Sequence, residues 1–71
     1  MVAPTAQRHT SCRNADLRRA NLAGRDLRFA DLTGASLQRA NLAGANLSNA
    51  QLQLANLTSA NLTGATVTSA R

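Results

Sequence analysis

The 71-residue chain has few of the features that usually hold small domains together. It contains one cysteine, Cys12, so no disulfide can form within the chain, and a lone thiol suits a reducing compartment. A single core of this size is marginal without disulfides, a metal or association with another chain. With internal disulfides excluded, the sequence predicts that one of the remaining means supplements the core.

Apolar runs and aromatic residues are also scarce. The first ten residues have no apolar stretch of signal-peptide length, and no segment approaches the roughly 20 apolar residues of a membrane span. The sequence therefore predicts a cytoplasmic protein without a membrane span. Phe29 is the only aromatic residue, so no series of aromatic side chains is available for stacking on bases.

Charge of one sign dominates the chain. There is no lysine and no glutamate, and the net charge of +5 comes from eight arginines against three aspartates. Seven of the arginines and all three aspartates lie between Arg8 and Arg39, whereas residues 40–70 carry no charge. The two halves of the chain are thus expected to present different surfaces.

Leucine, by contrast, is abundant and regularly spaced. A leucine recurs at every fifth residue from Leu17 to Leu62, and Val67 takes the next place. A period of five matches neither the 3.6-residue helix nor the two-residue strand, and on a helix it would advance about 140° per step, leaving no apolar stripe. Short units that bury their apolar residue only by stacking on copies of themselves are typical of solenoids.

Cut in this phase, residues 10–69 form twelve units, ten of which begin with alanine. Units such as ADLRR, ANLAG, ADLTG, ANLSN, ANLTS and ANLTG resemble the A(D/N)LXX pattern of the pentapeptide repeat family. The resemblance implies an all-β fold, a right-handed quadrilateral β-helix with one pentapeptide per side and about three coils. It assigns residues 10–71 to the β-helix and residues 1–9 to an irregular segment or partial cap.

In such a fold, residues 20 apart stack, with leucine and the leading alanine inward. Cys12 then occupies a leucine position, where a small apolar side chain fits. The column of Asn21, Asn41 and Asn61 is expected to allow a ladder of stacked amides. Arg25 stands where a small inward residue belongs, so we expect it to leave the interior or to pair with a carboxylate such as Asp26.

Groups for catalysis or metal binding are few. The aspartates Asp16, Asp26 and Asp31 are expected on different sides, so they form neither an acid–base pair nor a cage for a hard cation. His9 and Cys12 lack the further ligands that structural zinc requires. The sequence therefore predicts no catalytic residue, no cofactor and no metal site, and a protein that is not an enzyme.

The C-terminal repeats predict self-association. The unit ATVTS runs into Ala70 and Arg71 without an obvious cap, and solenoid ends that lack caps expose unpaired backbone groups. We expect the rung Thr66, Val67 and Thr68 to contact another chain, giving an end-to-end dimer or filament. The alternative is that these uncharged polar units are simply solvated.

A second candidate surface is basic. Arg18, Arg19 and Arg39 are expected on one side of neighbouring coils, with Arg13 on the preceding side. Such a patch fits nucleic acid phosphates without base specificity, an acidic protein or a lipid head group; the alternative is a solvated run of charges.

The family resemblance also implies a third function, because related quinolone-resistance proteins protect DNA gyrase by imitating duplex DNA. The positive charge and a height of only about 15 Å for three coils disfavour this function here. The favoured interpretation is a non-enzymatic scaffold that associates through its coil ends, with an unidentified protein partner also possible and anion binding as the alternative.

Overall fold

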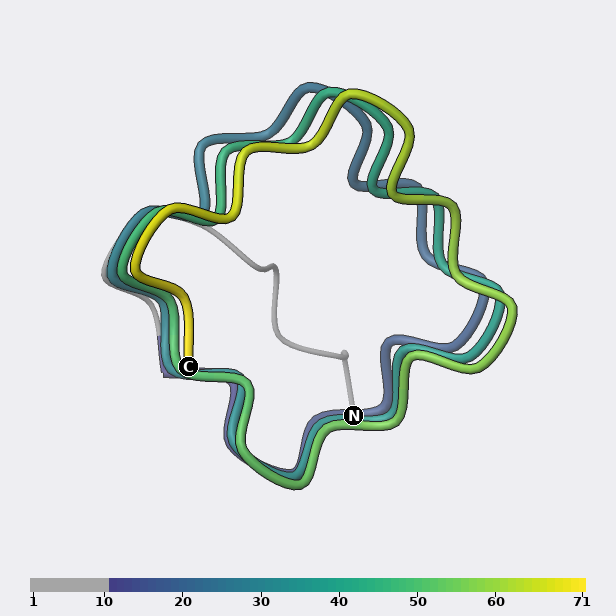
Figure 1. The fold of residues 1–71 in the computed structure, drawn as a ribbon. Helices are drawn as coiled ribbons and strands as arrows, with labels where there is room; N and C mark the ends of the chain where they lie inside the picture. Colours follow the sequence, from purple (N-terminus) through teal and green to yellow (C-terminus); the bar gives the residue numbers. More distant parts are fainter. Residues whose placement is uncertain (1–10) are drawn as a thin grey trace.

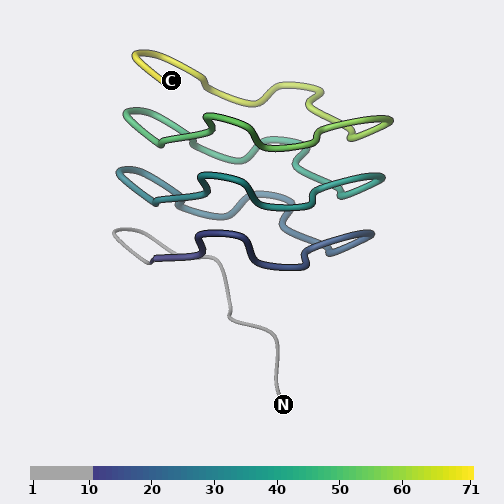
Figure 2. The ribbon, with the colours of Figure 1, turned by 90° about the horizontal axis from the view of Figure 1, so that it is seen from below.

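The computed structural model describes residues 11–71, which wind into stacked four-sided coils (Figures 1 and 2). Viewed along the axis, successive coils superimpose on one four-sided outline, and the perpendicular view shows them stacked with the C-terminus at one end. The predicted right-handed quadrilateral β-helix is confirmed. No helix in residues 11–71 is long and apolar enough to cross a membrane.

The described residues contain no helix and no continuous strand. Instead, the second residue of each pentapeptide forms isolated parallel bridges to residues 20 positions away, two in the middle coil and one in the first and last coils. This spacing confirms the predicted stacking. The eight bridges are Ser11–Asp31, Asp16–Ser36, Asn21–Asn41, Asp26–Asn46, Asp31–Gln51, Ser36–Asn56, Asn41–Asn61 and Asn46–Thr66.

A tight turn forms each corner. The carbonyl of the leucine accepts a hydrogen bond from the amide three residues later, as Leu42 does from Ala45 at 3.0 Å. The residue before that amide has a positive φ at all twelve corners, eight of them occupied by non-glycine residues and four by glycine. A positive φ at the third turn residue is the pattern of a type II turn, which favours glycine. At Leu54, φ is +62°, an unfavourable backbone conformation for a bulky side chain.

The core consists of the inward leucines and alanines, as predicted. Leu42 is completely buried in the middle coil, and the alanine positions beside it, Ala40 and Ala45, are equally inaccessible. Cys12 is also buried, and burial raises the pKa of its thiol, with a further increase from the nearby Asp31 carboxylate. Its position supports the interpretation of Cys12 as a small core residue.

The asparagine column differs from the prediction. The side-chain oxygens of Asn21, Asn41 and Asn61 accept hydrogen bonds from the backbone amides two residues later, at 3.2, 3.1 and 3.0 Å respectively. No amide ladder between these three residues forms in the described structure. Asparagine readily closes such a local turn, and this bond occupies its oxygen.

Arg25 leaves the interior, which confirms one of the two expected arrangements. Its side chain is exposed. Its backbone amide donates a hydrogen bond to the carbonyl of Leu22 at 3.2 Å, as at the other corners. The coil therefore tolerates arginine at this alanine position, because the side chain lies outside the interior and the backbone keeps its hydrogen bonds.

Candidate functional site

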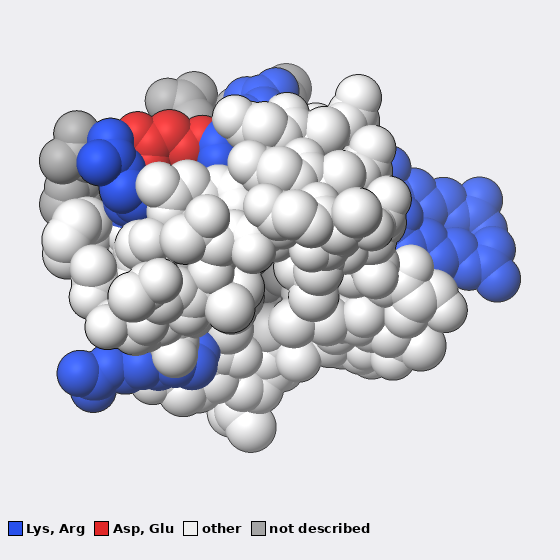
Figure 3. Space-filling model, turned by 45° about the horizontal axis from the view of Figure 1, so that its top comes forward, with Lys and Arg blue, Asp and Glu red and all other residues white. Residues whose placement is uncertain are grey.

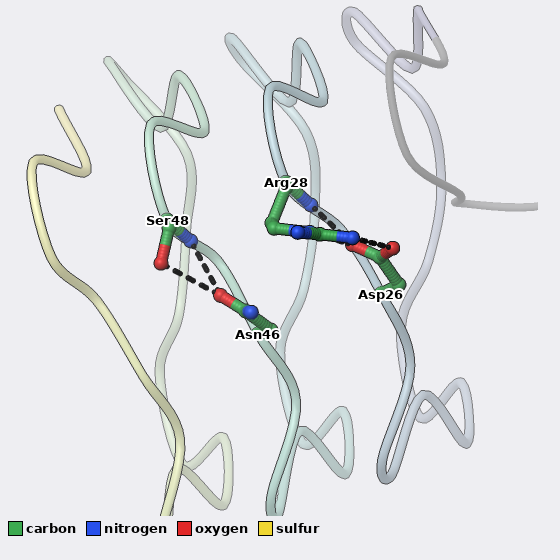
Figure 4. A network of polar contacts seen from close by, with 4 residues as sticks. All are labelled: Asp26, Arg28, Asn46 and Ser48. Carbon is green, nitrogen blue, oxygen red and sulfur yellow. Dashed lines mark hydrogen bonds and ion pairs between the residues drawn. The ribbon is translucent and has the colours of Figure 1, made fainter.

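Position two and position four of each pentapeptide lie together on the outer surface. Asp16 accepts two hydrogen bonds of 2.8 Å from the guanidinium of Arg18 and a third of 3.2 Å from its backbone amide. Asp26 and Arg28 repeat this arrangement, and one coil further along Ser48 donates to Asn46 at 2.7 Å in the same way (Figure 4). An arginine two residues after an aspartate thus folds onto its own repeat.

These contacts favour the ionised form of the carboxylates. Hydrogen bonds from the side chain and backbone of Arg18 lower the pKa of Asp16 to about 2. The pKa of Asp31 is also lowered, chiefly by the hydroxyl and amide of Thr33 and to a smaller extent by Arg13. At neutral pH each of these carboxylates therefore offsets a positive charge on a neighbouring arginine.

The structure brings together three of the four arginines predicted to form a basic patch. A shallow groove is lined by Arg18, Arg19 and Arg39, together with Asp16 and Gln38. Arg18 is held by Asp16, whereas Arg19 and Arg39 are exposed corner residues that form no ion pair within residues 11–71.

Arg13 lies outside this groove, on the preceding side. Its guanidinium contacts Asp31 at 3.4 Å. Two predicted patch residues, Arg13 and Arg18, thus each have a carboxylate beside them, so the positive charge left uncompensated in the patch is that of Arg19 and Arg39.

Gln38 is a residue of this groove that the sequence analysis missed. Its side-chain oxygen is buried and accepts no hydrogen bond within the described structure. Gln38 could have been predicted to line the groove from the 20-residue spacing. This spacing places Gln38 in one column with Arg18 and Thr58, next to the corner column of Arg19 and Arg39.

Two apolar side chains project from corners. Phe29 is 46% exposed and Leu54 is 90% exposed. Phe29 contributes to a second shallow groove, whose other lining residues are Asn49, Gln51, Gln53, Ser69 and Arg71.

The last coil, residues 51–71, exposes the inside of the solenoid. In one leucine column the exposed fraction changes from 0% at Leu42 to 39% at Leu62, and in the next from 1% at Leu47 to 53% at Val67. Figure 3 shows a broad uncharged surface with charged side chains confined to its margins. The C-terminal end therefore exposes apolar side chains of the core among uncharged polar residues, with Arg71 as its charged residue.

The backbone of this coil is equally open. The amides of Leu57, Leu62 and Val67 donate to no acceptor within residues 11–71, although the equivalent amides of Leu37, Leu42 and Leu47 each bond to the next coil. Corner amides follow the same pattern. The corner amides of Leu54, Ser59, Gly64 and Ser69 donate to no backbone carbonyl in the part of the chain that the structure describes.

The predicted rung of Thr66, Val67 and Thr68 lies on this coil, and all three residues are exposed. The carbonyls of Thr66 and Thr68 face the previous coil, where they accept from Leu47 at 2.7 Å and Asn49 at 3.0 Å. The amide of Thr66 donates to the carbonyl of Ala45 at 2.9 Å, whereas the amides of Val67 and Thr68 donate to no backbone carbonyl within residues 11–71.

No group of three histidine, cysteine or acidic side chains that could hold a metal ion occurs among residues 11–71. The histidine of the considered His9–Cys12 pair lies outside the described residues. The candidate surfaces in this part of the chain are the basic groove, the groove beside Phe29 and the open coil.

Comparisons with known proteins agree with the fold. The model of the family "Pentapeptide repeats" matches residues 8–39 and 35–71. Two solved pentapeptide repeat proteins of cyanobacteria are similar: Rfr23 of Cyanothece 51142, with 38% identity and a TM-score of 0.85, and alr5209 of Nostoc PCC 7120, with 33% identity and a TM-score of 0.64.

The chain is shorter than both of these proteins. The match to Rfr23 covers 86% of this chain and 42% of Rfr23, and the match to alr5209 covers 84% and 62% respectively. No curated protein matches the sequence.

Proposed function

Because the chain belongs to the pentapeptide repeat family, whose members are generally non-catalytic, we propose that it is an interaction module that binds a second copy of itself through its last coil. The observation that carries this proposal is the exposure of Leu62 and Val67, in columns whose middle-coil members, Leu42 and Leu47, are at most 1% exposed.

The physical basis is the same as for stacking within the chain. Fully burying a leucine or valine side chain is worth about 2 kcal/mol, and the open coil has several that are only partly buried. An edge of unpaired amides and carbonyls is a template for another β-structured chain. A second copy offers matching coils, and the absence of charge from residues 40–70 avoids like-charge repulsion.

The test places a charge where a partner coil would have to bury it. Val67→Lys is expected to leave the monomer folded, because the lysine side chain reaches water from the open end. It is expected to abolish association, measured by light scattering over a range of concentrations. Ala43→Lys, an outward position on the middle coil, adds the same charge and should associate as the wild type does. A wild-type chain that stays monomeric at high micromolar concentration would refute the proposal.

A second candidate function is anion binding in the basic groove, and the observation that favours it is the pair of stacked arginines, Arg19 and Arg39, without carboxylate partners in the described structure. Two adjacent guanidinium groups suit phosphate or sulfate groups of a nucleic acid, lipid or polysaccharide. Such binding weakens as salt rises, whereas association through the uncharged coil should persist.

For this candidate, the double substitution Arg19→Gln and Arg39→Gln is expected to lower the salt concentration at which the protein elutes from heparin, with folding stability changed by no more than about 0.5 kcal/mol. The matched control is Arg18→Gln together with Asp16→Asn, which removes a compensated pair and should elute as the wild type does. Equal elution of the double arginine variant and the wild type would exclude the groove as the binding site.

A further inference from the structure

We infer that the basic groove binds a phosphorylated serine or threonine side chain of a partner protein, with the phosphate held between Arg19 and Arg39 and the adjoining peptide group on the side-chain amide of Gln38. Such binding is a specific case of the second candidate function, on which it rests. Three features of the groove carry it: its uncompensated charge, the spacing of its arginines and a buried side-chain oxygen without a partner in the described structure.

The net charge of the groove matches two negative charges. Arg18 and Asp16 cancel, because the carboxylate accepts two hydrogen bonds of 2.8 Å from the guanidinium. The three aspartates are the only acidic side chains of the sequence, and within residues 11–71 none of them forms an ion pair with Arg19 or Arg39. A phosphate monoester carries a charge of about −1.5 to −2 at pH 7, whereas each phosphodiester of a nucleic acid carries one. Charge complementarity therefore favours a monoester.

Arg19 and Arg39 are close enough to share one phosphate group. The amide of Arg19 donates to the carbonyl of Gln38 at 2.9 Å, so the two arginines start from equivalent corners of neighbouring coils. Backbones joined in this way lie about 4.8 Å apart. Both side chains are exposed, and both residues have a φ of 61°, so the side chains leave the backbone in similar directions. Because a guanidinium binds phosphate oxygens in pairs, two of them one coil apart can enclose a single phosphate.

Gln38 supplies a neutral group beside these charges. Its side-chain oxygen is buried and has no hydrogen-bond partner within the described residues. Since this oxygen has no hydrogen bond to lose, turning the amide toward a ligand in the groove costs little. A side-chain amide offers an N–H donor and a C=O acceptor, the same two groups that a peptide bond offers. A phosphorylated residue in a polypeptide brings peptide bonds next to its phosphate, which inorganic phosphate does not.

Other carriers of phosphate fit the groove less well. Recruitment to anionic lipids uses clusters of about 4–8 Lys or Arg residues, and the groove has two uncompensated arginines. Single-stranded nucleic acid binds through stacking on aromatic side chains, and the single aromatic residue, Phe29, lies outside the groove. Small metabolites bind in clefts that bury most of their surface, whereas this groove is shallow. Arginine clusters on open surfaces are suited to phosphorylated segments of proteins.

The experiment titrates isotope-labelled protein with the blocked tripeptide Gly-phosphoserine-Gly and follows the backbone amide NMR signals of Arg19, Gln38 and Arg39. At pH 7 this peptide should bind about two- to fivefold more tightly than the same peptide carrying a methyl phosphodiester, because the monoester has the larger charge. Lowering the pH to 5 should weaken the monoester by a similar factor, since its second ionisation lies near pH 6, and leave the diester unchanged. Asp16, with a pKa of about 2, keeps its charge over this range, as the arginines do.

Variants assign the contacts. Arg19→Gln and Arg39→Gln should each weaken the phosphopeptide about two- to fivefold. The matched control, Arg25→Gln, removes an exposed arginine outside the groove and should bind as the wild type does. Gln38→Met removes the amide while keeping a side chain of similar length that adapts to a partly buried position. It should weaken binding of the phosphopeptide and leave binding of inorganic phosphate unchanged.

Preference for the monoester, losses in both arginine variants and a selective loss in Gln38→Met would support the inference. Equal binding of monoester and diester, a phosphopeptide that binds no more tightly than inorganic phosphate, or tighter binding of vesicles containing phosphatidic acid at equal phosphate concentration would overturn it. If elution from heparin still depended on Arg19 and Arg39 in those cases, anion binding in the groove would stand without this specificity. Self-association through the last coil is measured separately by light scattering and does not depend on the groove.

Discussion

Leu42→Arg should abolish folding. Leu42 is completely buried in the middle coil, between Leu22 and Leu62 of the same column, and no charged residue belongs to the described core. Burying a guanidinium there without a partner would cost more than a domain of this size has in stability. Circular dichroism should show loss of the β signal and of the cooperative thermal transition.

The matched control is Leu62→Arg, which makes the same change in the same column on the open coil. Leu62 is 39% exposed, so the guanidinium reaches water and the fold should survive. If Leu42→Arg kept the wild-type spectrum and melting temperature, the stacked arrangement of these coils would be wrong.

Ala40→Leu should be the second most damaging change. Ala40 is completely buried, and Ala20 and Ala60 occupy the equivalent positions in the adjacent coils. A larger side chain has no space there, and overpacking of this kind costs about 1–3 kcal/mol. For a chain of this length each kcal/mol lowers the melting temperature by about 4–8 °C.

Ala60→Leu provides the comparison, because Ala60 belongs to the last coil and is only partly buried. Urea denaturation of the two variants should show a clearly larger loss of unfolding free energy for Ala40→Leu. Equal losses would mean that the interior is as confined at the open end as in the middle coil.

The fold was predictable because one residue type recurs at one spacing. The leucine period sets which residues point inward, and four units per coil then place Leu22, Leu42 and Leu62 in one column. The difference in exposure between Leu62 and Leu42 was harder to predict, because both are leucines at the same position of the repeat. Only the position of Leu62 on the last coil distinguishes it.

The outer surface was less predictable, because the repeat fixes where a side chain starts but not which neighbour it binds. Asp16 and Arg18 are two residues apart, a spacing that would put side chains on one face of a strand, and the turn brings them into bidentate contact. The same local preference explains why Asn21 and Asn41 bond within their own repeats and form no ladder.

The four-sided coil gives length changes a simple geometric meaning. Duplication of 20 residues would add a whole coil and keep every column and every face in place. Duplication of a single pentapeptide between Arg19 and Arg39 would move every later residue to the next side of the coil. Arg39 would then leave the column of Arg19, while the leucines would still point inward. The interior therefore tolerates growth in steps of five residues, whereas a surface assembled from several coils is preserved only in steps of 20.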